Sequence, residues 1–205
     1  MAVYQELIQY IKKLPVVVFD REEKFIFFGN RKAGLHSVCR HHLKDRAVLK
    51  KDFPWDWQRL ADAMLGAIHL YFKFTVIRNP YDRTVSAFHA LQQYSRKWPG
   101  MEFKTFVKTE LAAKGYVVNE HFFPQYPNVY YKKLPMLDFV ARIETIERDF
   151  EVIAEHIGCD PDLPWENQSR HEHYSKYYDR ESKMIVESIY KLDIDLFGYR
   201  FEKGA

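Results

Sequence analysis

Cysteine is scarce in this chain of 205 residues, which contains two of them. Cys39 and Cys159 stand alone in the sequence, so they form neither the paired spacing of a zinc site nor a disulfide framework. Small secreted proteins usually depend on several disulfides, whereas free thiols are typical of reducing compartments. The cysteine content therefore predicts a cytoplasmic protein, and the sequence offers no diagnostic metal-binding motif.

Long apolar runs are also missing. The longest nearly uncharged stretch, Ala63–Phe72, has about ten residues, whereas a helix needs about 20 apolar residues to cross a bilayer. The first residues, Met1–Lys13, are interrupted by glutamine and glutamate and lack the apolar centre of a signal peptide. We therefore expect neither a membrane span nor export.

An excess of charge of one sign is missing too. The 31 Lys and Arg residues against 28 Asp and Glu residues leave a formal net charge of +3. A dedicated nucleic-acid-binding domain carries a much larger basic excess, so we expect no nucleic-acid partner. Any site for an anionic ligand must be local. The oligomeric state cannot be read from the sequence.

Short buried strands alternate with helical patterns along the chain. Apolar runs typical of buried strands occur at residues 16–19, 24–28, 71–78 and 138–143. Helical patterns occur at residues 1–13, 37–42, 55–70, 80–94, 103–114, 146–157 and 180–192. This alternation predicts an α/β fold of three layers, with a central parallel sheet flanked by helices. We expect one domain that spans residues 1–205.

The turn after the second strand has the composition of a phosphate site. Small residues, Gly29 and Gly34, allow close approach of the backbone, while Arg31 and Lys32 add positive charge just before a helix start. The arrangement is similar to a P-loop. It is not the Walker motif, because Leu35-His36 stands where that motif requires Lys-Ser. An ordinary basic surface turn is the alternative reading.

A second strand exit offers a second anion site. Arg78 ends a strand, and Ser86 lies about 9 Å along the helix that Pro80 opens. A long arginine side chain can span that distance, and its guanidinium together with a hydroxyl suits a second phosphate. The alternative is a structural ion pair between Arg78 and Asp82.

These segments resemble the carbohydrate sulfotransferases. The stretch KFIFFGNRKAGLHS at residues 24–37 is similar to their 5′-phosphosulfate loop, and FTVIRNPYDRTVSAF at 74–88 is similar to their 3′-phosphate motif. NEHFFPQ at 119–125, DFVARIE at 138–144 and FGY at 197–199 resemble further family segments in the same order. The resemblance covers residues 24–201 and departs from the family mainly at Arg31, Leu35 and His36.

The resemblance implies a donor and two phosphate sites. The donor is 3′-phosphoadenosine 5′-phosphosulfate, and the sulfuryl group passes to a hydroxyl or amine of a saccharide acceptor. The residues implied at the 5′-phosphosulfate are Arg31, Lys32, Ala33, Gly34, Leu35, His36 and Ser37. Arg78 and Ser86 are implied at the 3′-phosphate, and Lys32 is implied as the catalytic cation. No metal is expected, because fixed cations can balance the charge of the sulfuryl group.

The acceptor hydroxyl must lose its proton as the new bond forms, and a histidine suits that role near neutral pH. We assign the base to His121, with Glu120 and His36 as alternatives. The segment that contains Ser169 and Arg170 corresponds to a family loop that closes over the nucleotide.

Two other functions remain open from the sequence. A nucleotide-dependent phosphotransferase is one, although the Walker lysine position is missing. A catalytically impaired nucleotide-binding module of the same fold is the other, motivated by Leu35 and His36.

Overall fold

The fold is described by a computed structural model, which places residues 16–20, 24–34, 38, 48–49, 70–131, 134–162 and 172–204. The predicted site residues Leu35, His36, Ser37, Ser169 and Arg170 lie outside the described residues. So do the helix predicted at 1–13, the helix predicted at 37–42 apart from Val38, and the helix predicted at 55–70 apart from Leu70. The chain divides into two units. The sheet unit comprises Met1–Ile77 with Pro127–Glu166, and the helical unit comprises Arg78–Tyr126 with Asn167–Ala205. The expected single domain over residues 1–205 stays a prediction.

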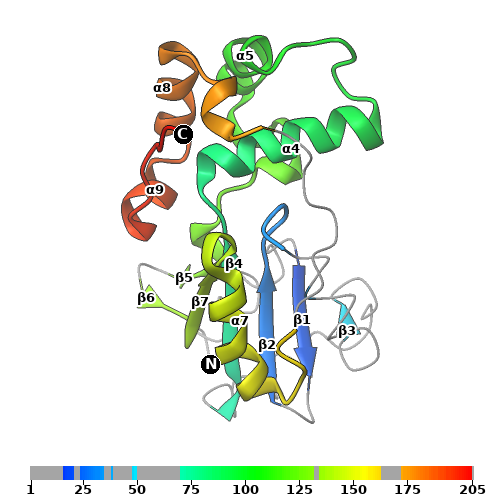
Figure 1. Ribbon diagram of the computed structural model, residues 1–205, viewed down its shortest axis with the longest axis vertical. Coiled ribbons are helices and arrows are strands. Elements are labelled where there is room, and N and C mark those ends of the chain that lie inside the picture. The colour runs from blue at the N-terminus through cyan, green and yellow to red at the C-terminus, as the bar shows by residue number, and fades with distance from the viewer. Residues whose placement is uncertain are drawn as a thin grey trace, which may run out of the picture. The chain divides into compact units, whose positions relative to one another are not determined.

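A five-stranded sheet with the order β3-β1-β2-β4-β7 forms the sheet unit (Figure 1). Its strands are β1 (Val16–Asp20), β2 (Phe25–Gly29), β3 (Val48–Leu49), β4 (Phe72–Ile77) and β7 (Phe139–Arg142). The central pairs β2–β4 and β4–β7 are parallel, with Phe25 opposite Phe72 and Phe74 opposite Phe139. The predicted α/β fold with a mostly parallel sheet is confirmed.

The edge of the sheet departs from the parallel pattern. β1 pairs antiparallel with β2, and the register joins Asp20 to Phe25. A parallel pair needs a crossover of about a dozen residues or more, and the short connection between Asp20 and Phe25 leaves room only for a hairpin. β3 continues antiparallel on the other side of β1. A separate antiparallel pair joins β5 (Tyr130–Tyr131) to β6 (Leu134–Pro135).

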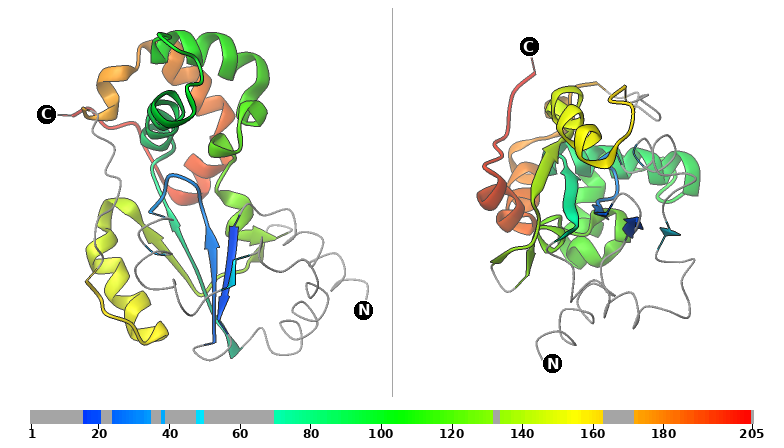
Figure 2. Two further views of the ribbon diagram at one scale, coloured as in Figure 1. Left: turned by 90° about the vertical axis from the view of Figure 1, so that its right-hand side faces the viewer. Right: turned by 90° about the horizontal axis from the view of Figure 1, so that it is seen from below.

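Helix α7 (Ile146–Ile157) covers one face of the sheet, as the two views of Figure 2 show. Its buried residues Phe150 and Ile153 belong to the same apolar cluster as Phe27 and Phe74 of the strands. The rings of Phe27 and Phe74 stack with centroids 5.0 Å apart. The helix ends where the sequence predicts, because Gly158 adopts a left-handed φ of 64° that suits glycine.

The helical unit is built around α4 (Pro80–Ser95). The remaining helical segments among the described residues are α5 (Phe103–Phe106), η3 (Val107–Leu111), α6 (Ala112–Lys114), η4 (Gly115–Val118), η5 (Glu120–Phe122), η6 (Tyr126–Asn128), η7 (Ile143–Thr145), η8 (Tyr174–Tyr177), α8 (Arg180–Ile189) and α9 (Lys191–Phe197). Of these, η7 belongs to the sheet unit, and η6 begins in the helical unit at Tyr126 and ends in the sheet unit. Asn79 caps α4 by accepting a hydrogen bond from the Tyr81 backbone N–H at 3.0 Å.

Aromatic side chains fill the core of the helical unit. Phe88 of α4 lies with its ring centroid 5.0 Å from that of Phe106, and Phe106 lies 5.3 Å from Phe122. All three rings are buried. This core fixes α4 against the turn that carries His121. None of the described helices is long and apolar enough to cross a bilayer.

Candidate functional site

The turn after β2 in the sheet unit carries the first group of predicted residues. Lys32 and Gly34 both adopt left-handed backbone conformations, with φ values of 66° and 71°. This conformation suits glycine but is uncommon for a residue with a side chain, and such strain often gathers where a ligand binds. Ala33 is fully buried, while the side chains of Arg31 and Lys32 are half-buried. Two cations therefore flank a tight backbone turn.

Gly34 also lies close to the end of β7. A Cβ atom at this position would approach the Ile143 Cδ1 atom to 3.0 Å, so glycine is required by space as well as by conformation. Beside it, a cavity of about 290 Å³ is lined by residues 143–148, where β7 passes into α7. The Val38 backbone N–H donates to the Gly34 carbonyl at 3.1 Å.

A buried polar cluster holds this turn to the sheet. The Asn30 side-chain amide donates to the Thr75 Oγ1 atom and to the Val76 carbonyl, each at 3.0 Å. The Asn128 side-chain amide donates to the Asn30 Oδ1 atom at 2.6 Å, and the Thr75 hydroxyl donates to the Phe28 carbonyl. None of these three polar residues was predicted to have a role from the sequence. The available signal was a threonine inside a buried strand and an asparagine directly after one.

Arg78 and Ser86 come together in the helical unit, as their spacing suggests. The Arg78 Nη1 atom donates to the Ser86 hydroxyl at 3.1 Å, and its Nε atom donates to the Asp82 carboxylate at 2.8 Å. The ion pair expected as the alternative for Arg78 is present, and the same guanidinium also contacts Ser86, while the phosphate site stays a prediction. Its side chain is 15% exposed, and both contacts lie on one face of α4. The orientation of the guanidinium plane is therefore set before any ligand binds.

The backbone of Arg78 is held by Gln125. The Arg78 N–H donates to the Gln125 Oε1 atom at 2.9 Å, and the Gln125 Nε2 atom donates to the Arg78 carbonyl at 2.8 Å. Gln125 is 0% exposed. Gln125 lies in a segment that resembles the family, but its role could not be predicted, since its partner lies 47 positions away.

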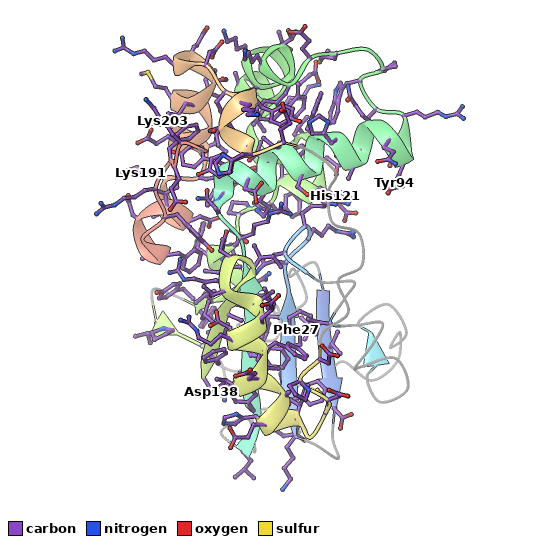
Figure 3. The ribbon with its side chains drawn as sticks, in the orientation of Figure 1. Phe27, Tyr94, His121, Asp138, Lys191 and Lys203 are labelled. Carbon is purple, nitrogen blue, oxygen red and sulfur yellow. The ribbon has the colours of Figure 1, made fainter. Side chains whose placement is uncertain are left out.

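His121 lies on the η5 turn, and Figure 3 labels it. Its Nδ1 atom is 2.7 Å from the Asn119 Oδ1 atom, which also accepts the His121 backbone N–H at 3.1 Å. A carbonyl oxygen requires the proton on Nδ1, so the neutral ring carries its lone pair on Nε2. Glu120, the predicted alternative base, is exposed on the same turn.

The loop after η5 is anchored by buried charged and polar groups. Arg83 donates from Nη1 to the His121 carbonyl at 3.2 Å and from Nη2 to the Phe123 carbonyl at 2.7 Å. The Tyr190 hydroxyl donates to the carbonyl of Phe122 at 2.7 Å. Three successive carbonyl groups of this loop are therefore bonded to side chains of α4 and of the residue before α9.

Asp193 secures the other end of the same loop. Its carboxylate accepts the Gln125 N–H at 2.8 Å and the Tyr126 N–H at 2.8 Å. Asp193 is fully buried. Burial raises the pKa of this carboxyl group, while the charge of Arg83 and these N–H donors act in the opposite direction. The loop is thus fixed at both ends by residues distant in sequence.

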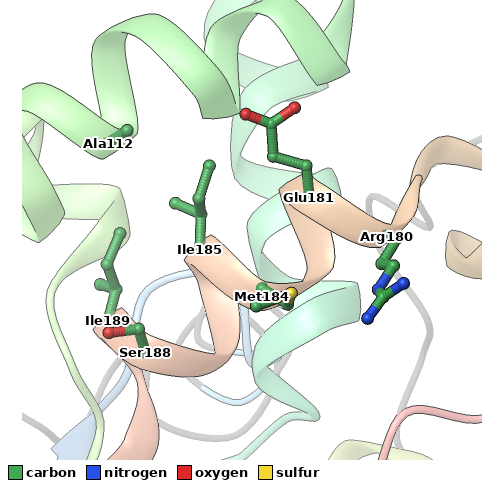
Figure 4. Close-up of a pocket in the computed structure, with 7 residues that line it drawn as sticks. All are labelled: Ala112, Arg180, Glu181, Met184, Ile185, Ser188 and Ile189. Atoms are coloured by element: carbon green, nitrogen blue, oxygen red, sulfur yellow. The ribbon is translucent and has the colours of Figure 1, made fainter.

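A cavity of about 560 Å³ in the helical unit contains none of the predicted residues (Figure 4). Its lining residues are Ala112, Arg180, Glu181, Met184, Ile185, Ser188 and Ile189. The lining is mainly apolar and does not suit a nucleotide phosphate. Across the described ranges, no group of three or more His, Cys, Asp or Glu side chains is arranged to hold a metal ion.

Comparison with known proteins gives one match. The sequence model of the sulfotransferase family matches residues 13–200, which is nearly the whole chain. No curated protein and no solved structure matches. The matched range contains the turn after β2, the Arg78–Ser86 pair and the His121 loop. The chain belongs to the sulfotransferase family.

Proposed function

We propose that this sulfotransferase moves the sulfuryl group of 3′-phosphoadenosine 5′-phosphosulfate to a hydroxyl or amine of a carbohydrate or glycan-bearing acceptor. Membership of the family supports sulfuryl transfer. The observation that carries the choice of donor is the Arg78–Ser86 contact at 3.1 Å, an oriented cation beside a hydroxyl. Such a pair suits a phosphate monoester, which distinguishes this donor from nucleotides without a 3′-phosphate.

The 5′ end of the donor is assigned to the turn after β2. Lys32 and Arg31 supply positive charge there, and the backbone N–H group of Gly34 is the proposed phosphate donor, since the Ala33 N–H already donates to the Asn30 carbonyl at 3.3 Å. Leu35, His36 and Ser37 complete the proposed loop from the sequence. Ser169 and Arg170 are proposed to cover the nucleotide. These assignments rest on the sequence resemblance and on the strained turn at Lys32.

His121 is the proposed base. As the acceptor oxygen forms its bond to sulfur, its proton passes to Nε2 of the ring, while Nδ1 stays bonded to Asn119. The bond between sulfur and the 5′-phosphate oxygen breaks at the same time, and the electron pair leaves with adenosine 3′,5′-bisphosphate. Lys32 stabilises the negative charge that develops on that leaving oxygen. His36 and Glu120 remain alternative bases.

The cellular location, the partners and the acceptor class are further proposals, which rest on composition and on the family resemblance. Cytoplasmic residence rests on the low cysteine content, and the absence of a nucleic-acid partner rests on the net charge of +3. The saccharide acceptor rests on the resemblance to carbohydrate sulfotransferases.

Calorimetry tests the donor. We expect adenosine 3′,5′-bisphosphate to bind at least about tenfold more tightly than ATP or adenosine 5′-phosphate, since each lacks the group assigned to Arg78. Tighter binding of ATP would favour the phosphotransferase instead. A crystal structure with the bisphosphate bound tests whether one molecule contacts both Lys32 and Arg78.

Transfer of labelled sulfate tests turnover. The wild type, Lys32→Ala and His121→Ala are compared on a panel of glycans, lipids and peptides. We expect transfer to a glycan by the wild type and a loss of at least about a hundredfold in the His121→Ala variant. Donor binding without transfer to any acceptor would favour the impaired binding module.

A further inference from the structure

Gln125 joins two parts of the helical unit that the proposed function uses separately. Its side-chain amide forms a closed pair of hydrogen bonds with the Arg78 backbone, at 2.9 Å and 2.8 Å. The Gln125 amide therefore pairs with the Arg78 backbone as an adjacent β-strand would. It accepts from the Arg78 N–H and donates to the Arg78 carbonyl. Because the side chain is 0% exposed, water cannot replace either bond without rearrangement.

The main chain of Gln125 belongs to the loop that follows His121. Its N–H donates to Asp193 at 2.8 Å. Arg83, whose Nη1 and Nη2 atoms bond the His121 and Phe123 carbonyls, fixes the start of the same loop. A movement of the Arg78 backbone would therefore move the Gln125 side chain and, with it, the loop that follows His121. That loop is itself held by the hydrogen bonds to Arg83 and Asp193.

We infer that Gln125 is a positioning residue that couples the arginine proposed for the 3′-phosphate to the loop that carries the proposed base. This inference rests on the proposed function. It adds that Gln125 connects the two sites, so that the same hydrogen bonds that fix the Arg78 backbone also fix the loop that carries His121. Recognition of the 3′-phosphate by Arg78 and the orientation of the base His121 then both depend on Gln125.

The hydrogen bonds of the Arg78 side chain distinguish a positioning role of Gln125 from a contribution to packing alone. The Arg78 guanidinium is held by Asp82 and Ser86 at 2.8 and 3.1 Å, both on α4, independently of Gln125. Loss of the Gln125 amide would leave the side chain tethered to α4 while its backbone loses both partners. The expected result is a rotated guanidinium and a relaxed His121 loop, rather than a merely less stable unit.

The chain offers a matched control for this substitution. The Gln92 side-chain amide also bonds two backbone groups, the carbonyls of Trp98 and Met101, at 2.9 Å and 2.7 Å. Gln92 lies on α4 in the same unit but touches neither Arg78 nor the His121 loop through these bonds. Gln125→Ala and Gln92→Ala therefore remove the same chemical group at a coupled and an uncoupled position.

The experiment measures two quantities on the full chain. The first is the ratio of the dissociation constants of adenosine 5′-phosphate and adenosine 3′,5′-bisphosphate, which reports the preference for a 3′-phosphate. The second is the side-chain ¹⁵N resonances of His121, identified by their loss in His121→Gln. We expect Gln125→Ala to lower the ratio by about tenfold and to shift the Nδ1 resonance, whereas Gln92→Ala changes neither.

A second variant keeps the test decisive if Gln125→Ala does not fold. In Gln125→Glu the protonated carboxyl group can donate to the Arg78 carbonyl and accept from its N–H, but the carboxylate cannot donate. Asp193, which binds the Gln125 N–H, disfavours a second negative charge there, whereas Arg83 and Arg78 favour it. We expect the preference for the bisphosphate, relative to wild type at each pH, to fall as the pH rises.

Two outcomes overturn the inference. One is a lower melting temperature for Gln125→Ala with an unchanged ratio and an unchanged His121 spectrum. The other is a ratio for Gln125→Glu that does not depend on pH relative to wild type. Failure of the proposed function looks different, because the wild type itself would then show no preference for the bisphosphate.

Discussion

Asn30→Ala is the substitution that most directly tests how the turn after β2 is held. Asn30 is 3% exposed, and its side chain forms three hydrogen bonds, with Thr75, Val76 and Asn128. A buried neutral hydrogen bond contributes about 1 kcal/mol net, so the three bonds together contribute about 3 kcal/mol. The partners left behind are buried as well, which moves the expected cost toward the upper part of a range of about 2–4 kcal/mol.

Urea denaturation followed by circular dichroism measures this loss as a lower midpoint with an unchanged slope. Glu151→Ala, at an exposed position of α7 in the same unit, serves as the control and should change the free energy of unfolding by less than about 0.5 kcal/mol. The double variant Asn30→Ala with Asn128→Ala should cost about 1 kcal/mol less than the sum of the single variants, because they share a bond of 2.6 Å. A cost for Asn30→Ala no larger than that of the control, together with additive single variants, would refute the reasoning.

Three further predictions concern the turn, acid stability and the donor. Gly34→Ala should destabilise the protein by about 1–3 kcal/mol in thermal denaturation, because the new Cβ atom meets Ile143 at 3.0 Å and the φ of 71° is unfavourable. Gly100→Ala has nearly the same φ, 72°, but open space, so it should cost less; equal costs would show that the contact with Ile143 is irrelevant. Burial would raise the pKa of Asp149, but hydrogen bonds from Arg142, Thr145 and Arg148 lower it below its usual value. A lowered pKa in the folded state gives stability that is present above the unfolded pKa of about 4 and is lost as the pH falls further, so Asp149→Asn should flatten the acid limb of a stability curve measured in urea. Ser86→Ala should weaken binding of adenosine 3′,5′-bisphosphate about fivefold or more in calorimetry while leaving that of adenosine 5′-phosphate unchanged; equal losses for both nucleotides would contradict the assignment.

Local pattern predicted a large part of the fold correctly. The apolar spacing and Gly158 predicted helix α7 at Ile146–Ile157, and Asn79-Pro80 predicted the start of α4. The contact between Arg78 and Ser86 was expected from a spacing of eight residues. These features depend on neighbours within two or three helical turns, where the 3.6-residue period largely decides which side chains meet.

The buried polar residues that support the candidate site could not be predicted from the sequence. Asn30 meets Asn128 across 98 positions, and Gln125 meets Asp193 across 68. No periodicity relates such residues, and a single asparagine, glutamine or aspartate in a loop is ordinary in composition. Their roles follow from burial. Once packing has removed water, each buried polar group needs a hydrogen-bond partner in the protein, and the folded structure identifies that partner.

The alternation of strands and helices, the basic turn with its small residues and the proximity of Arg78 and Ser86 could be predicted from the sequence alone, since each arises from short-range geometry. The antiparallel direction of β1, the hydrogen bonds from Asn30 to β4 and the bonds between Gln125 and Arg78 became apparent from the folded chain. A buried hydrogen bond forms between the polar groups that the packed core brings within about 3 Å of each other, and which groups these are depends on the packing of the whole chain.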